Sequence, residues 1–276
     1  MTLSLQIWAA TLVTAVLLTA PPGWADAAPG GDESSEKKAT TAAIEANTAA
    51  AKALLEQSAD FLAAQPKFSF EAQTGFDSVQ MNGQHLAFFE NKKALVRRPN
   101  RLRVETDEAD GDEHTFRFDG KQISIDLPGE NAYVAVEKSG TIDEMTDYIV
   151  DDLEIPVPLH DFFSSNFYQA AQAGIVSGFY VDEATIGKRQ CHHLAFRQID
   201  VDFQIWIEDG DRPLPCSLVI TYKKAAGQPQ YWARFDDWNL SPRAGDKQFE
   251  FTPPKGAERL SIRAAVEEIR EDTEAK

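Results

Sequence analysis

Apolar and polar residues alternate with a period of two through most of the chain after Pro66, as they do in β-strands that bury one face. A first group of expected strands covers residues 67–76, 85–97, 102–106, 115–118, 122–125 and 132–136. Turn residues separate these runs, and Asp119-Gly120 is the clearest hairpin signal among them. Because short turns join only antiparallel neighbours, the pattern predicts an antiparallel meander.

A second group of strands alternates more regularly and is expected at residues 174–186, 191–198, 201–208, 216–223 and 231–240. In the third of these runs one face carries Val201, Phe203, Ile205 and Ile207, and the other carries Asp202, Gln204, Trp206 and Glu208. A sheet with one apolar face needs a cover over that face. The second meander therefore requires helices from elsewhere in the chain.

Two helical segments supply this cover. Residues 41–64 predict an amphipathic helix that the following proline terminates. Residues 141–153 predict another helix, which starts with the capping pair Thr141 and Glu144, and residues 159–167 predict a short helix or an aromatic-rich loop. The expected fold class is α+β, with a single long, curved antiparallel sheet wrapped around these helices.

The N-terminus has the features of an export signal. Residues 3–20 carry no charged side chain, and the small-residue pattern Ala25-Asp26-Ala27, shortly after a proline pair, matches a signal-peptidase site. We therefore expect a signal peptide over residues 1–27 and release into the periplasm with no stable membrane anchor. The alternative is a permanent transmembrane anchor, because the apolar stretch approaches spanning length.

The remaining chain divides by composition. Residues 28–41 are rich in Gly, Ser, Ala and charged side chains, with almost nothing to bury, and predict a disordered leader. The folded domain is expected over residues 42–260. From there to the end, residues 261–276 form a charged segment that predicts a solvated helix or tail.

Charge narrows the range of partners. The 276 residues carry a formal net charge of -17, which argues against nucleic acid, because phosphate binding needs an excess of Lys and Arg. It also argues against docking on anionic lipid through a basic patch. One basic concentration stands out, at Arg97, Arg98, Arg101 and Arg103. These arginines either pair with the surrounding acidic residues or bind an anionic head group or partner.

The two cysteines lie in a chain that is expected to enter an oxidising compartment. Cys191 opens one predicted strand and Cys216 opens the next strand but one, so both lie at the same end of the meander. In a regular sheet this places them about 9.6 Å apart, whereas a disulfide needs Cα atoms within about 7 Å. A bridge therefore requires the middle strand to end near Glu208, which the turn signal Asp209-Gly210 permits. Two buried free thiols are the alternative.

Catalytic motifs are absent from the sequence. It contains no Gly-x-Ser-x-Gly, no phosphate-cradling glycine loop and no His-Glu-x-x-His. The adjacent His192 and His193 point to opposite faces of a regular strand, so they cannot both bind one metal ion. One imidazole is expected to face the interior and the other the solvent. We predict no catalytic residue, no metal site and no cofactor.

Several runs of residues carry a resemblance to a known family. They are RRPNRLRV at 97–104, CHHLAFR at 191–197, WIEDG at 206–210, PLP at 213–215, LVITYK at 218–223 and FEFTPP at 249–254. Through them the chain, from about residue 46 to 260, resembles the bacterial predicted periplasmic proteins called domain of unknown function 2092. That family is similar to the superfamily of LolA, LolB, LppX and RseB. The resemblance implies an unclosed, strongly curved half-barrel sheet whose concave face is covered by helices.

The resemblance also implies a hydrophobic pocket between sheet and helices, which relatives use to hold acyl chains or peptide ends. Aromatic residues alternately placed on the first strands are expected to line it: Phe68, Phe70, Phe88, Phe116 and Phe118. A second aromatic cluster lies between the meanders and forms either a lid over the cavity or a plug in it: Phe162, Phe163, Phe167 and Tyr168. Whether the interior is hollow or filled is a question of volume.

These observations favour a binding protein over an enzyme. We expect a periplasmic protein that holds a hydrophobic ligand, such as a lipid or a lipoprotein acyl chain, in the concave face of its sheet. The first alternative is an envelope interaction or stress-sensing module that binds peptide or protein. The second alternative is an enzyme of unknown type, whose sign would be clustered polar groups in a pocket.

Overall fold

The computed structural model describes residues 33–109, 111–153, 155 and 159–265. The chain divides into two compact units, Met1–Thr40 and Thr41–Lys276. Of the first unit the structure describes residues 33–40, which are helical. The signal peptide predicted over residues 1–27 lies outside the described residues and stays a prediction. The second unit contains the sheet and the candidate site.

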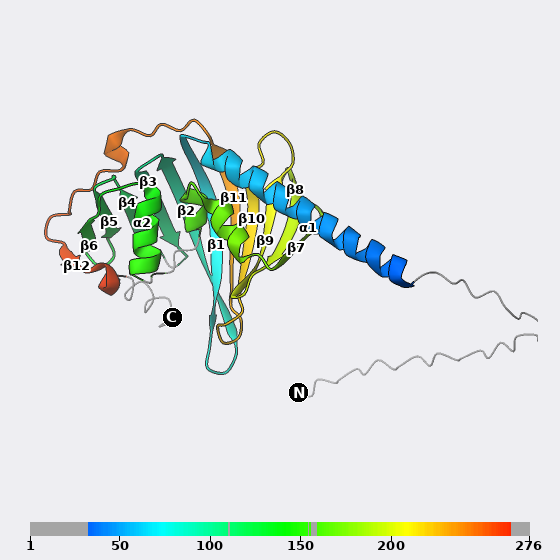
Figure 1. Ribbon diagram of the computed structural model, residues 1–276. Helices are drawn as coiled ribbons and strands as arrows, with labels where there is room; N and C mark the ends of the chain where they lie inside the picture. The colour runs from blue at the N-terminus through cyan, green and yellow to red at the C-terminus, as the bar shows by residue number, and fades with distance from the viewer. Residues whose placement is uncertain (1–32, 110, 154, 156–158, 266–276) are drawn as a thin grey trace, which may run out of the picture. The chain divides into compact units, whose positions relative to one another are not determined.

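Twelve strands in the described part of the chain form one sheet, which is antiparallel except at one edge (Figure 1). They are β1 (Lys67–Val79), β2 (His85–Arg97), β3 (Arg101–Glu108), β4 (Glu113–Phe118), β5 (Gln122–Leu127), β6 (Ala132–Glu137), β7 (Ser177–Ile186), β8 (Arg189–Arg197), β9 (Val201–Glu208), β10 (Pro215–Tyr222), β11 (Gln230–Asn239) and β12 (Glu258–Leu260). Their order is β12-β6-β5-β4-β3-β2-β1-β11-β10-β9-β8-β7. Strand β1 pairs with both β2 and β11 and so joins the two meanders. The α+β class and the unclosed sheet are confirmed, whereas its strong curvature stays a prediction.

The helices are α1 (Glu33–Ala63), α2 (Ile142–Asp147), a π-helical turn (Tyr148–Asp152), α3 (His160–Phe163) and α4 (Phe167–Gly174). The predicted capping pair is present: Thr141 Oγ1 accepts a hydrogen bond from the Glu144 N–H at 3.2 Å, and the Glu144 carboxylate accepts one from the Thr141 N–H at 2.8 Å. Helix α1 begins earlier than predicted, so residues 33–41 of the expected leader are helical. Glu, Lys and Ala in that stretch favour a helix.

The helices lie against one face of the sheet, which we call the helix-covered face (Figure 1). The helices contribute Leu55, Leu62, Ile142, Met145, Phe162 and Phe163 to the core, and the sheet contributes alternate residues such as Phe68, Phe70, Val96 and Phe235, all of them buried. On β1 and β2 this face carries the even-numbered residues, because side chains alternate between the two faces of a strand.

Helix α1 is fixed to the free edge of the sheet by side-chain hydrogen bonds. The Asn47 amide donates to the Tyr180 carbonyl at 3.2 Å and accepts from the Tyr180 N–H at 2.7 Å, as a neighbouring strand would. Thr48 donates to the carbonyl of Gly178 at 2.5 Å. A Cβ on Gly178 would collide with the ring of Phe196, so only glycine fits there. The helix therefore protects part of the β7 edge, which would otherwise be open to pairing.

A C-terminal segment returns over β2 and β6. Arg97 donates to the carbonyl of Ala244 at 2.7 Å, forms an ion pair with Asp246 and places its guanidinium 5.4 Å from the Phe249 ring centroid. Strand β12 then pairs in parallel with β6. Ile262 is 8% exposed and is part of the core, so the beginning of the charged segment predicted over residues 261–276 packs on the domain. Residues 266–276 lie outside the described residues.

The Asp246 carboxylate gives a test of this segment. The hydrogen bond from Arg97 lowers its pKa below the usual aspartate value. Because the shift is downward, the interaction is complete above the usual aspartate pKa and is lost as the pH falls through the lowered pKa. We expect Arg97→Met to raise the pKa of Asp246 towards the usual aspartate value. The measurement is the chemical shift of the Asp246 carboxyl carbon in an NMR pH titration. Lys247→Met, the adjacent cation, is the control and should not change it. An unchanged titration in Arg97→Met would contradict the assignment.

Candidate functional site

The structure places the predicted pocket residues on strands of the sheet and on the helices α3 and α4, most of them within or against one core. Six of them are buried, namely Phe68, Phe70, Phe118, Phe162, Phe163 and Tyr168, and Phe88, Phe116 and Phe167 are half-buried. Phe70 on β1 lies 6.2 Å from Phe163 of α3 and 4.6 Å from Trp238 of β11, measured between ring centroids. Phe162 of α3 lies 5.1 Å from Phe235. Near α3 these rings therefore pack on one another, in the arrangement expected of a plug; the ligand pocket itself stays a prediction.

Farther along the helix-covered face an apolar row crosses six strands. Successive pairs in the strand registers define it as Phe88, Phe76, Tyr231, Ile220, Phe203 and Phe196. Phe76 and Phe88 stack at 5.5 Å, and both are only half-buried, as is Ile220. The helices thus leave part of this face's apolar surface accessible. We call these six residues the apolar row.

Charged and hydroxyl side chains lie on the same face between the apolar row and the aromatic core. Lys92 Nζ is 2.5 Å from a carboxylate oxygen of Glu90 and 3.2 Å from Thr106 Oγ1. The Thr74 hydroxyl donates a hydrogen bond to the same Glu90 carboxylate oxygen, at 3.3 Å. Thr74 and Thr106 are 0% and 2% exposed. We call these four residues the polar cluster. An ion pair on a covered sheet face is costly to desolvate, and here the two threonine hydroxyls satisfy part of its hydrogen bonding.

The buried hydroxyl of Tyr231 adjoins this cluster. The side chain is 4% exposed and lies beside Thr74, yet its Oη forms no hydrogen bond of normal geometry with any described residue. Burial raises its pKa well above the usual tyrosine value, so the hydroxyl stays protonated and is available as a donor. A buried polar atom without a partner costs about 1–3 kcal/mol, which a ligand or a water molecule can recover.

The sequence contained a signal for this cluster that the prediction missed. In the run 85–97 the positions on the core face are Leu86, Phe88, Glu90, Lys92, Ala94 and Val96. Two consecutive charged residues at interior positions break the alternation that otherwise predicts a buried apolar face. This break in the alternation is the signal that would have identified the polar cluster from the sequence.

The histidine pair is separated across the strand, as predicted from β geometry. His192 lies between the Tyr180 hydroxyl, at 3.1 Å, and Asp209, at 3.2 Å. His193 stacks on Trp206 with 4.1 Å between ring centroids and is 15% exposed, so its ring packs on a neighbour and does not point freely to solvent. Among the described residues no group of three or more His, Cys, Asp or Glu side chains is placed to hold a metal ion.

The cysteines are joined in a disulfide, with Cα atoms 6.9 Å apart. Two features of the sheet bring them within reach. Strand β9 ends at Glu208, which is the partner of Cys191, and the register of β10 is interrupted between Pro215 and Ser217, where Cys216 lies. The disulfide therefore spans the end of β9, as the predicted geometry required.

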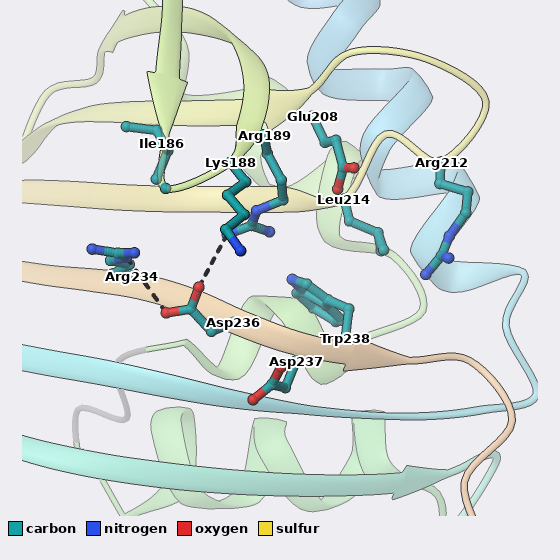
Figure 2. Close-up of a pocket in the computed structure, with 11 residues that line it drawn as sticks. Ile186, Lys188, Arg189, Glu208, Arg212, Leu214, Arg234, Asp236, Asp237 and Trp238 are labelled. Atoms are coloured by element: carbon teal, nitrogen blue, oxygen red, sulfur yellow. Dashed lines mark ion pairs between the residues drawn. The ribbon is translucent and has the colours of Figure 1, made fainter.

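A second candidate site lies near this disulfide, where β9 ends and β10 begins (Figure 2). It is a cavity of about 440 Å³ between the β7–β8 turn, the β9–β10 loop and the end of β11. Trp238 and Leu214 form its apolar wall, and both also belong to or pack against the aromatic core. Charged side chains from the β7–β8 turn, β8, β9, the β9–β10 loop and β11 line the cavity. We call it the strand-end pocket.

Several solved structures are similar to this chain. Mycobacterium tuberculosis lipoprotein LppX is 13% identical, with 70% of this chain and 97% of that chain covered and a TM-score of 0.46. An uncharacterized conserved protein from Thermus thermophilus is 10% identical, with coverages of 77% and 99% and a TM-score of 0.45. MucB in complex with MucA from Pseudomonas aeruginosa is 17% identical, with coverages of 73% and 61% and a TM-score of 0.40.

The comparison with curated proteins gave no match. No helix among the described residues is long and apolar enough to cross a membrane. The family model of a predicted periplasmic protein (DUF2092) matches residues 51–263, which is most of the chain. The chain therefore belongs to the DUF2092 family of predicted periplasmic proteins.

Proposed function

We propose that this protein is an exported binding protein that holds an amphiphilic molecule, such as a lipid or a lipoprotein acyl chain, against the helix-covered face of its sheet. The observation that carries the proposal is the apolar row, of which Phe88, Phe76 and Ile220 are only half-buried, beside the polar cluster on one face. The periplasmic assignment of the family supports it.

The two surfaces match the two ends of such a ligand. The apolar chain lies along Phe88 and Phe76, which are partners in register, and along Ile220, which the buried Tyr231 separates from Phe76. The polar end meets the polar cluster, in which Lys92 is paired with Glu90, and the adjoining Tyr231 hydroxyl, which has no hydrogen bond of normal geometry among the described residues. Each buried methylene contributes about 0.8 kcal/mol, so roughly ten fully buried methylenes contribute about 8 kcal/mol. This lies within the range of about 4–15 kcal/mol that association costs.

The test uses two neighbouring residues that point to opposite faces. Mature protein is purified from the periplasm without detergent and examined by native mass spectrometry with lipid extraction. We expect a discrete bound mass in the wild type and about a tenfold lower bound fraction in Phe88→Ser, because that side chain loses about 1.5 kcal/mol of burial. Phe89→Ser is the control, since Phe89 is 47% exposed on the opposite face, against Trp232.

Each outcome has a defined meaning. A clean mass without extractable lipid, from protein whose thermal melt shows it to be folded, contradicts the proposal. Equal losses in Phe88→Ser and Phe89→Ser would show that the apolar row is not the binding surface. Loss of the ligand in Phe88→Ser together with its retention in Phe89→Ser supports the proposal.

One observation favours the peptide-binding alternative. The edge strand β7 exposes Phe179 and Val181, which are 53% and 40% exposed, while helix α1, among the described residues, bonds to Gly178 and Tyr180 of this strand. An extended peptide adds to such an edge through main-chain hydrogen bonds. A stable protein partner captured without lipid, and lost when Val181 is replaced by proline, would favour this function over the first.

A further inference from the structure

The strand-end pocket is built by three local features. At the tip of the β7–β8 hairpin, Gly187 has φ +64°, and a Cβ there would lie 3.1 Å from Nη2 of Arg234, so glycine allows the turn to approach β11. In β11 the register with β1 is interrupted, and Asp237 has φ +51° in this irregular stretch. The disulfide joins the ends of β8 and β10 beside it. Strained backbone of this kind persists where surrounding structure enforces it.

The apolar wall of the pocket is fixed in place. The Trp238 indole N–H donates to the Pro215 carbonyl at 2.9 Å, and the ring packs on Phe70 at 4.6 Å. Leu214 is 1% exposed, and Ile186 is half-buried. The wall therefore presents an immobilised aromatic ring and aliphatic groups to any occupant, at little cost in side-chain entropy.

Cations outnumber carboxylates around this wall. The pocket is lined by Lys188, Arg189, Arg212 and Arg234, and by Glu208, Asp236 and Asp237 (Figure 2). Arg189 donates to the Phe235 carbonyl and lies 3.7 Å from Asp236, which Arg234 approaches at 3.4 Å. One carboxylate thus orients two guanidinium groups and neutralises one of them.

The remaining charges are less constrained. Within the described part of the chain Lys188 and Arg212 make no ion pair, and neither do Glu208 and Asp237. The pocket therefore has one positive charge in excess, in a chain whose net charge is -17. A local reversal of sign around a cavity favours an anionic occupant, because surface charges more than about 8 Å away are screened at physiological salt.

We propose that the strand-end pocket is a second binding site, separate from the helix-covered face, for an anionic group carried on a small aromatic or apolar body. The oriented guanidinium groups of Arg189 and Arg234 receive the phosphate or carboxylate, and the Trp238 ring packs against the apolar body. Paired N–H donors of arginine match the oxygen geometry of both anions. A cavity of about 440 Å³ accommodates a small ligand of this class.

The test follows the Trp238 indole N–H resonance in a ¹H–¹⁵N NMR spectrum, assigned by its disappearance in Trp238→Phe. Phenyl phosphate and benzoate are titrated as aromatic anions, benzyl alcohol as the neutral counterpart, and inorganic phosphate as the anion without an apolar body. We expect saturable shifts with the aromatic anions, weaker binding by at least tenfold with the other two, and weakening as salt is raised. Preference for phenyl phosphate over benzoate would identify the phosphate as the recognised group, and the reverse preference the carboxylate.

Variants separate this site from its surroundings. Arg234→Met is expected to weaken phenyl phosphate binding about tenfold or more, and the exposed Arg212→Met serves as a second variant that does not disturb Asp236. Lys224→Met is the control, because Lys224 pairs with Asp200 outside the pocket. Equal binding of benzyl alcohol and phenyl phosphate, or unaltered binding in both arginine variants, overturns the proposal. Phe88→Ser should leave this binding unchanged, so failure here is distinct from failure of the proposed function.

Discussion

Phe70→Ala is expected to lower the free energy of unfolding by about 3–5 kcal/mol, the cost of deleting a fully buried aromatic ring. Phe70 is 2% exposed and connects three elements that are distant in sequence. Its ring contacts Phe163 of α3, at 6.2 Å, and Phe235 and Trp238 of β11, at 5.4 and 4.6 Å. Because these residues cannot close on one another without moving α3, a cavity would remain. Urea denaturation followed by tryptophan fluorescence measures the change.

Phe89→Ala provides the matched control for this prediction. Phe89 lies on the neighbouring strand β2, is 47% exposed and contacts Trp232 on the opposite face from Phe70. Since about half of its surface stays exposed to solvent, we expect a loss below about 1 kcal/mol. If both substitutions had the same small effect, the rings near α3 would not form a packed core. That result would favour a hollow interior and a larger ligand on the helix-covered face.

Replacing both Cys191 and Cys216 by alanine is expected to lower the free energy of unfolding by about 3 kcal/mol. The bridge closes a loop with a sequence separation of 25, and removing it enlarges the unfolded ensemble. The two side chains are 1% and 0% exposed, so the native strands hold them together even without the bond. The measurement is urea denaturation of the wild type and of the double variant.

Reduction of the wild type with dithiothreitol should reproduce the double variant, because both remove the same covalent link. If the oxidised and reduced proteins had the same denaturation midpoint, the bridge would not stabilise the fold. The single variants are less informative, since each leaves a thiol that can form intermolecular disulfides. The Trp238 indole resonance in the double variant reports separately on whether the bond also shapes the strand-end pocket.

Local features of the structure were predictable because their causes are local. Alternation with period two located the strands of both meanders, and the Asp119-Gly120 turn lies between β4 and β5, where Gly120 has φ +83°. The pair Thr141 and Glu144 forms its capping box as predicted. Each signal involves residues a few positions apart, whose geometry is set by backbone sterics and hydrogen bonding.

The disulfide was predictable only in part. The spacing of Cys191 and Cys216 in the predicted meander placed them at the same end of a sheet but too far apart for a bond in regular geometry. The end of β9 at Glu208 and the interruption of β10 closed the distance to 6.9 Å. The sequence therefore predicted the condition for a bond, and the three-dimensional register met it.

The candidate sites depended on contacts between distant parts of the chain, which periodicity does not encode. The pairing of β1 with β11 aligns Phe76 with Tyr231 and so assembles the apolar row from both meanders. The strand-end pocket likewise needs Arg189 of β8 beside Asp236 of β11, which are not neighbouring strands.

The sequence by itself thus determined the strands of the two meanders, the cap at Thr141 and the alternation of apolar positions along most strands, because these follow from the spacing of nearby side chains. Only the tertiary structure decided which strands became neighbours, how the registers aligned and where Lys92 and Glu90 met Thr74. The physical reason is that strand pairing and register are selected by the total burial and hydrogen bonding of the whole sheet, in which each local pattern is compatible with several partners.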